Sequence, residues 1–337
     1  MSGIKMKLLK HKKAVVFSLL SILLSTMFIL ILTSGLKSEL ESGIEFSRSR
    51  ADTVNAYYDS FRDYSRFVFE ISAKACVDAI SQDIVNNIQF YPDEETFYND
   101  VSRCMLTGSI SFPSDHELIA TEGLLIDDIF EILTNLTEGE YKIKSNYTVN
   151  DINILTYTNS GDVYSDEFKV VAKTTVELSD DNILLSPGEF QTVVRVKLNG
   201  MIDPYYSINT STLKRINDII VIGKNDDHLR NLKFSEFLEK VDYIQYFKGV
   251  SIMNRVVNNF SESDVGVISF LNRSTDYETD SYVDIYKMDN TYFPSEDLYC
   301  EKKDGACIDG DYFRIDAVTL AAMEARYDLD VSDWGRI

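Results

Sequence analysis

The feature that most constrains this chain is an apolar run near the start of the sequence, residues 14–36, which holds no charged side chain. The run is 23 residues long, and a helix of that length crosses the ~30 Å hydrocarbon core of a bilayer. A secretory signal has a shorter apolar region of roughly 7 to 15 residues, although Thr33, Ser34 and Gly35 offer small side chains for cleavage. A helix buried in a soluble core is a third interpretation. Length and uniform apolarity favour a transmembrane helix at 14–36.

Charges on the two sides of the run predict its orientation. No acidic residue precedes the run, whereas Glu39, Glu41 and Glu45 follow it. The residues before it include five lysines: Lys5, Lys7, Lys10, Lys12 and Lys13. Basic flanks stay in the cytoplasm, and no later stretch is long and apolar enough for a second crossing. We therefore expect a cytoplasmic basic leader at 1–13, a single pass through the cell membrane, and an extracytoplasmic body.

The expected body is strongly acidic. The chain has 33 Lys+Arg and 54 Asp+Glu, and five of the lysines precede the run, so 28 basic and 54 acidic residues follow it, a net charge of −26. Anionic polymers and anionic lipid headgroups would be repelled by such a surface. The composition therefore disfavours nucleic acid as a partner, and the lipid bilayer is expected only around the apolar run.

Four cysteines give a second indication of compartment: Cys76, Cys104, Cys300 and Cys307. An even number of cysteines in an exported chain suggests disulfides, and four allow three pairings. Proximity in the sequence favours Cys300–Cys307, across the turn signal Asp304-Gly305, and Cys76–Cys104. A zinc site is the alternative, but the sequence has no C-x-x-C and no histidine near the cysteines.

Helical periodicity continues after the apolar run. Leu36, Leu40 and Ile44 are four apart, and Pro92 is a natural stop. Between them, apolar side chains recur three and four apart at seven positions: Val54, Tyr57, Phe61, Tyr64, Val68, Ile71 and Ala75. The pattern predicts an amphipathic stalk helix at 37–90. Its apolar stripe is a packing face, either for the chain's own domain or for another subunit.

Residues 91–337 have the pattern of one extracytoplasmic α+β domain. Apolar and polar residues alternate in three segments, 141–149, 168–178 and 190–198, which predicts strands of an antiparallel sheet with one wet face. Helical periodicity returns at 124–133, 234–247 and 250–260, and in a last helix from Asp316 as N-cap to Tyr327. The predicted fold class is thus α+β: a long N-terminal transmembrane-plus-amphipathic helix, followed by an antiparallel-sheet ectodomain with additional helices.

Catalytic signatures are missing from the sequence. It has three scattered histidines and no H-E-x-x-H, G-x-S-x-G, P-loop or G-x-G-x-x-G, so we name no catalytic residue and no cofactor. The best cation candidate is the segment with Asp304, Asp309 and Asp311, because calcium prefers hard oxygens on a bent backbone. Its spacing does not match an EF-hand loop, and an acidic hairpin tip explains the same residues.

A strip of small residues lies within the apolar run. Ala14, Ser18, Ser21 and Ser25 are four, three and four apart, so they share one side of a helix. Small residues let helices approach closely in lipid. The strip predicts helix packing, although small residues are also tolerated in a lone anchor.

The order of these segments resembles the plan of type IV pilin-like proteins, especially archaeal surface ones. The basic leader ends in Lys12-Lys13-Ala14, and a long apolar helix, an amphipathic helix and a β-rich domain follow. The resemblance implies cleavage between Ala14 and Val15 and assembly with itself or with other pilin-like subunits. The chain departs from the pilin plan because it has no acidic residue between Val15 and Ser34. Three short patterns, Gly200–Pro204, Ser269–Arg273 and Phe313–Asp316, also resemble archaeal membrane-anchored proteins.

These features predict a membrane-anchored, surface-exposed protein that serves structure, adhesion or assembly, with a pilin-like protein as the most specific form. An anchored extracytoplasmic enzyme or ligand-binding domain is the alternative. A receptor is disfavoured because no cytoplasmic signalling domain is expected before the anchor.

Overall fold

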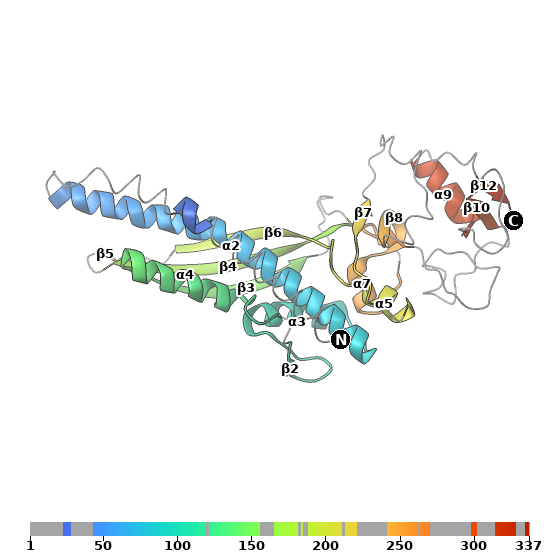
Figure 1. Ribbon diagram of the computed structural model, residues 1–337, viewed down its shortest axis with the longest axis horizontal. Coiled ribbons are helices and arrows are strands. Elements are labelled where there is room, and N and C mark those ends of the chain that lie inside the picture. Colours follow the sequence, from blue (N-terminus) through green and yellow to red (C-terminus); the bar gives the residue numbers. More distant parts are fainter. Residues whose placement is uncertain are drawn as a thin grey trace, which may run out of the picture. The chain divides into compact units, whose positions relative to one another are not determined.

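The structure of the chain is a computed structural model, shown in Figure 1. It describes residues 23–27, 43–118, 121–155, 165–180, 183–184, 188–210, 213–220, 241–261, 263–269, 298–301, 314–327 and 334–336. Over these residues the fold is mixed α+β, in which a long helix packs against antiparallel sheets and further helices. The predicted fold class is confirmed at this level.

The long helix α2 runs over Gly43–Asn87 and is 45 residues long. No proline interrupts this segment, and its only glycine is the first residue. The helix ends before Ile88, whose positive φ of 53° leaves the helical region. Of the stalk helix predicted for 37–90, residues 43–87 are helical, residues 88–90 are turn and loop, and residues 37–42 lie outside the described residues.

The predicted apolar stripe of α2 is buried within the chain itself. Val54, Tyr57, Phe61, Tyr64 and Val68 are between 1% and 8% exposed. Beyond Val68 the buried face rotates to a second set, which includes Phe69, Ala73, Cys76, Val77, Ile80 and Ile84. The stripe prediction was wrong at its last two positions, Ile71 and Ala75, which are only half-buried. A straight helix drifts by roughly 20° per heptad from a strict seven-residue repeat, so the stripe slides off the buried side.

The described residues divide into two compact units, and those of the first fall within 1–67, 132–149 and 174–190. The boundary falls inside α2, α4 (Ile126–Tyr141), β3 (Ile143–Leu155), β4 (Glu167–Asp180) and β6 (Gly188–Lys197). In the first unit, the ring of Phe61 lies 6.4 Å from that of Phe190 on β6 and 6.4 Å from that of Tyr147 on β3. The Tyr57 and Thr137 hydroxyls, on α2 and α4, are 3.1 Å apart. This part of α2 is thus held against both the sheet and a second helix.

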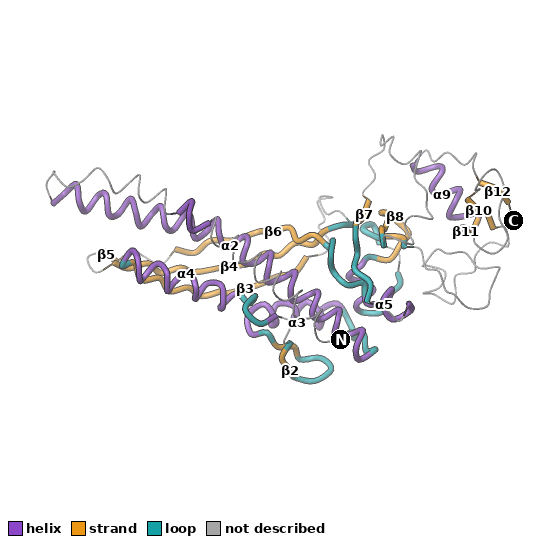
Figure 2. The backbone as a smooth tube through the Cα atoms, in the orientation of Figure 1, coloured by secondary structure: helices purple, strands orange, loops and turns teal. Residues whose placement is uncertain are grey.

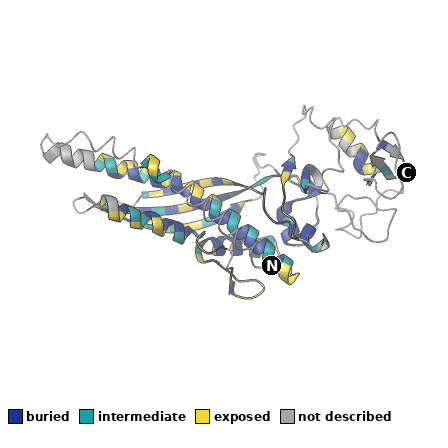
Figure 3. Ribbon diagram, in the orientation of Figure 1, coloured by how far each residue is buried: buried dark blue, intermediate teal, exposed yellow. Residues whose placement is uncertain are grey.

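The largest sheet contains the three strands predicted from alternation. Its order is β3-β4-β5, with β5 at Ile183–Leu184, and β6 also pairs with β4 (Figure 2). Burial alternates residue by residue along β4 and β6, which Figure 3 shows as bands of buried and exposed residues. One face therefore packs on the core and the other is open, as expected for an antiparallel sheet with one wet face.

The described residues of the second unit fall within 68–131, 150–173 and 191–337. It contains α3 (Glu94–Thr107), followed by the short hairpin of β1 (Ser109–Ile110) and β2 (His116–Glu117). Cys76 of α2 and Cys104 of α3 form a disulfide, with a Cα–Cα distance of 5.8 Å. This is one of the two pairings expected from sequence proximity. Both cysteines are fully buried, so the bond lies in the core between the two helices.

A small mixed sheet corrects two helix predictions. It has the order β7-β8-β9, with β7 at Asp218–Ile220, β8 at Asp242–Val250 and β9 at Val267–Ile268. The helix predicted for 234–247 was wrong over 242–247, which is strand. Tyr243, Ile244 and Tyr246 are all buried, and a strand buried on both faces has the same apolar run as a helix.

Connections around this sheet also differ from the predicted pattern. The pairing of β7 with β8 is parallel, unlike the antiparallel pairing of β8 with β9. The helix predicted for 250–260 is confined to α7 (Ile252–Val256), and α5 (Pro204–Thr210) was not predicted.

The pairing of β8 with β9 has a bulge between Gln245 and Val250, and there a Cβ on Gly266 would collide with the carbonyl of Gly249. Glycine is required at this close backbone approach.

The last described elements form a three-stranded sheet with one helix. The strand order is β11-β10-β12, with β10 at Leu298–Glu301, β11 at Arg314–Asp316 and β12 at Trp334–Arg336. Helix α9 (Ala317–Tyr327) begins directly after Asp316, so the predicted last helix is confirmed.

The predicted transmembrane helix at 14–36 lies mostly outside the described residues. Residues 23–27 of it are helical, and the Thr26 hydroxyl donates to the Leu23 carbonyl at 2.9 Å. In the described part of the chain, no helix has the length and apolarity that a membrane crossing needs. The span at 14–36 stays a prediction.

Candidate functional site

Helix α3 sets the position of a surface pocket. Its first turn is capped by Asp93, whose side chain accepts a hydrogen bond from the Thr96 N–H at 2.7 Å. The hydrogen bond lowers the pKa of the Asp93 carboxyl, because it favours the charged form. The helix ends at Gly108, whose φ is 70° and whose N–H donates to the Cys104 carbonyl at 2.8 Å. Both ends of α3 are thus determined by local sequence.

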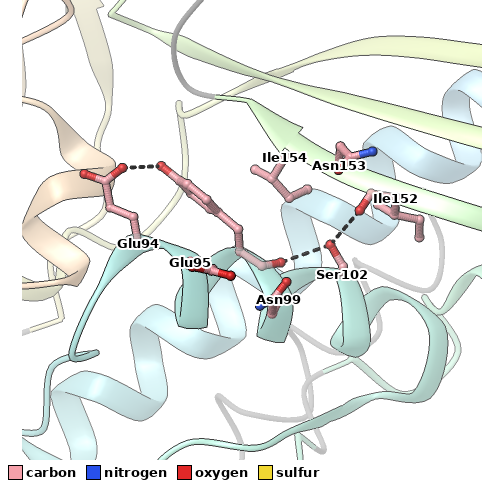
Figure 4. Close-up of a pocket in the computed structure, with 8 residues that line it drawn as sticks. Glu94, Glu95, Asn99, Ser102, Ile152, Asn153 and Ile154 are labelled. Carbon is pink, nitrogen blue, oxygen red and sulfur yellow. Dashed lines mark hydrogen bonds between the residues drawn. The ribbon is translucent and has the colours of Figure 1, made fainter.

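The pocket lies between α3 and β3 and has a volume of about 370 Å³ (Figure 4). Helix α3 contributes Glu94, Glu95, Tyr98, Asn99 and Ser102, and β3 contributes Ile152, Asn153 and Ile154. The lining combines two carboxylates with two amides, two hydroxyls and two isoleucines. Such a lining suits a polar or positively charged group.

Two hydroxyl groups in this pocket donate hydrogen bonds to oxygen atoms. The Ser102 hydroxyl lies 3.0 Å from the Tyr98 carbonyl oxygen and 3.2 Å from the Ile152 carbonyl oxygen (Figure 4). Both of these backbone oxygens accept hydrogen bonds. The Tyr98 hydroxyl donates to Glu94 at 3.5 Å.

A buried carboxylate on the same helix is structural. Asp100 is 1% exposed and accepts from the Tyr91 hydroxyl at 3.0 Å, from the Ser111 N–H and hydroxyl at 2.8 and 2.7 Å, and from the Phe112 N–H at 3.0 Å. Burial, followed by the charge of Asp100, raises the pKa of the Tyr91 hydroxyl. The tyrosine therefore stays protonated and donates. With four donors, Asp100 anchors the segment after β1 and is occupied by that role.

A second buried cluster joins Asp203, Tyr243, Arg255 and Ser269. The Arg255 and Asp203 side chains are fully buried, and Nη1 of Arg255 lies 2.7 Å from the Asp203 carboxylate. The same nitrogen donates to the Ser269 hydroxyl at 3.2 Å, and the Tyr243 hydroxyl donates to Asp203 at 2.7 Å. The guanidinium carbon lies 5.4 Å from the centre of the Tyr243 ring. This network connects α7 to the chain before α5 and to the small mixed sheet.

Two residues of this network, Asp203 and Ser269, lie in short sequence patterns named above, whereas Arg255 does not. Asp203 belongs to the pattern Gly200–Pro204 and Ser269 to the pattern Ser269–Arg273, and the structure brings both to Arg255. No sequence signal singled out Arg255, because a buried arginine in a short helix has the same local pattern as an exposed one.

The open face of the large sheet carries an excess of positive charge within the second unit. Four basic side chains point from β4 and β6 to this face, Lys169, Lys173, Arg195 and Lys197. Glu167 lies on the same face and pairs with Arg195 at 3.1 Å, and Glu177 and Glu189 carry negative charge on the part of this face that belongs to the first unit. Val193, which is 49% exposed, lies among the basic side chains. On a chain with a net charge of −21, this face is a candidate surface for an acidic partner.

Most of the site residues predicted from the sequence lie outside the described residues. These are the calcium candidates Asp304, Asp309 and Asp311, the cysteine Cys307, and the strip residues Ala14, Ser18 and Ser21. The Cys300–Cys307 pairing and the calcium site therefore stay predictions. Ser25 is described and exposed. In the part of the chain that the structure covers, no three His, Cys, Asp or Glu side chains are grouped as metal ligands would be.

No protein-family model, curated protein or solved structure matches this chain.

Proposed function

We propose that this chain is a membrane-anchored surface protein whose extracytoplasmic body serves assembly or adhesion. The observation that carries the proposal is the buried disulfide Cys76–Cys104, placed soon after the apolar run 14–36. Such bonds form and persist in oxidising compartments, and they are rare in the cytosol. The basic leader, the apolar run and the acidic body support the same topology.

The pilin-like form of the proposal needs a different contact surface from the one that the sequence suggested. The stripe from Val54 to Val68 is buried in the chain's own core, so it is not free to bind a second subunit. Two surfaces support assembly instead. One is the small-residue strip within the apolar run, and the other is the basic part of the open sheet face in the second unit, with Lys169, Lys173, Arg195 and Lys197. Because the body carries excess negative charge, the acidic surface of a second copy is the complementary partner for the basic face.

The topology is tested by adding protease to intact cells that have no outer membrane or wall barrier. We expect loss of residues 37–337 and protection of the leader. Complete protection of the chain, with a known surface protein degraded in the same cells, contradicts the proposal.

Processing is tested by the mass of the native N-terminal peptide. A peptide that begins at Val15 supports the pilin-like form, because cleavage after Ala14 removes the basic leader. An intact leader that includes Lys5 to Lys13 leaves an anchored surface protein without pilin-type processing.

An anchored ligand-binding domain is the second candidate, and the pocket between α3 and β3 favours it. The double variant Glu94→Gln, Glu95→Gln removes both carboxylates while keeping the side-chain size. Loss of cell or surface binding in this variant, with assembly unchanged, supports the second candidate over the first.

A further inference from the structure

A cavity of about 190 Å³ lies against the C-terminal sheet. It is lined by Tyr299 of β10, Trp334 of β12, and Ala317, Leu320, Ala321 and Glu324 of α9. These residues come from three described segments, 298–301, 314–327 and 334–336, that the function proposed above does not use. The cavity has the volume of about six water molecules, which is enough for a small organic ligand.

Local geometry explains why a cavity forms here. Positions 317, 320, 321 and 324 follow helical spacing, so they lie on one face of α9. Two of them are alanines, which leave space between the helix and the sheet. In the antiparallel pair of β10 and β12, Glu301 is opposite Trp334, and Tyr299 is two residues from Glu301. Tyr299 and Trp334 therefore share one face of the sheet and form aromatic walls.

The residues that line the cavity favour a positively charged ligand. Two aromatic side chains and one carboxylate line the cavity, and none of its six lining residues is basic. Trp334 is 8% exposed and forms an inner wall, whereas Glu324 is exposed and lies at the rim. Aromatic faces attract cations through their quadrupole, tryptophan most strongly, and the carboxylate adds an opposite charge. From these contacts we propose that the cavity binds a small organic cation of the quaternary ammonium class.

The chain provides its own reporter for this site, because Trp334 is its only tryptophan. The experiment titrates the full chain with three molecules of similar shape while tryptophan fluorescence is recorded. They are choline, its neutral analogue 3,3-dimethylbutan-1-ol, and the anion 3,3-dimethylbutanoate. We expect a saturable change with choline, roughly tenfold weaker binding of the alcohol because the cation–π attraction is lost, and no saturable change with the anion.

Three variants separate binding from direct quenching. Ala321→Leu fills the cavity and keeps Trp334, so choline should no longer change the fluorescence. Glu324→Gln removes the charge of an exposed side chain without altering the packing, and it should weaken choline binding several-fold. Val318→Leu lies on the exposed side of α9, where Val318 is 61% exposed, and it should leave binding unchanged.

Several outcomes overturn the inference. Equal affinity for choline and the alcohol means that the cavity binds apolar groups without selecting charge. Tighter binding of the anion reverses the proposed electrostatics. A response to choline that persists in both Ala321→Leu and Glu324→Gln comes from elsewhere, and the absence of any saturable response in the unaltered chain excludes the site.

Discussion

Phe61 of α2 meets Phe190 of β6 edge to face, with ring centres 6.4 Å apart and an interplanar angle of 77°. This contact places the aromatic stripe of α2 in the core of its own unit. Edge-to-face aromatic pairs contribute beyond the burial of their area. The stripe is therefore a determinant of folding, and substitutions in it should change stability before they change assembly.

Phe61→Ala should destabilise the chain by about 3–5 kcal/mol, because a fully buried ring is replaced by a cavity. Phe67 of the same helix is 45% exposed, so Phe67→Ala is a matched control that should cost less than about 1 kcal/mol. Urea unfolding followed by circular dichroism measures both. Equal effects of the two substitutions would contradict the buried position of the stripe.

The Asp203–Arg255 pair should be intolerant of single substitutions. Arg255→Met leaves the Asp203 carboxylate buried without its cation, which should cost about 3–5 kcal/mol. The exposed pair of Arg62 and Asp59, at 3.3 Å, is the control, and Arg62→Met should cost less than about 1 kcal/mol. Unfolding of Asp203→Asn, Arg255→Met and the double variant completes the cycle. Strictly additive costs in the double variant would show that the two side chains do not interact.

The folded chain should lose stability at high pH through ionisation of Tyr91. Its pKa is raised in the folded chain, so its contribution is fully present below the unfolded pKa of about 10 and is lost as the pH rises toward the folded value. Over that window the free energy of unfolding should fall by about 1.4 kcal/mol per pH unit through this group. Tyr91→Phe removes this contribution, so its stability should fall less steeply between pH 10 and 11.5. Identical slopes would mean that Tyr91 ionises normally when folded.

Removal of the Cys76–Cys104 disulfide should cost about 3.6 kcal/mol in the chain-entropy model, given the separation of 28 residues. The double variant Cys76→Ser, Cys104→Ser tests this by thermal unfolding. A reductant should lower the melting temperature of the unaltered chain toward that of the variant. The variant Cys300→Ser, Cys307→Ser controls for the other cysteines, and a shift of equal size there would assign the effect to them instead.

Charge reversal on the open sheet face tests the proposed assembly surface. Lys173→Glu with Lys197→Glu should reduce crosslinked multimers several-fold, and salt should have a similar effect on the unaltered chain because it screens exposed charges. Arg62→Glu with Arg66→Glu makes the same change in charge on exposed positions of α2 and should leave the multimers unchanged. Equal losses in both variants would indicate a general effect of net charge.

Much of the fold was accessible from the sequence where one local pattern has one structural solution. Alternation predicted β3, β4 and β6, because a strand with one wet face must repeat every two residues. Helical spacing predicted α2, and Asp316 predicted the start of α9. The 234–247 prediction failed for the opposite reason: a short apolar run is compatible with both a helix and a strand that is buried on two faces.

The candidate sites were less accessible than the fold, because each joins residues that are far apart in the sequence. The pocket between α3 and β3 unites residues 94–102 with 152–154, and the cavity of the C-terminal sheet unites Tyr299, α9 and Trp334. Helical spacing alone indicates that Ala317, Ala321 and Glu324 share a face. It does not indicate which strands that face meets.

By itself the sequence determined the apolar run, the charge asymmetry around it, the α+β class and the periodicity of the main elements, because these depend on neighbouring residues and on solvation. Only the tertiary structure decided that the stripe of α2 is buried in the core, that Arg255 joins Asp203 to Ser269, and that basic side chains of β4 and β6 gather on the second unit's part of the open sheet face. The physical reason is that burial and charge pairing depend on which distant segments meet. A local pattern specifies which residues lie on the same face of a helix or strand. The packing of the whole chain specifies what covers that face.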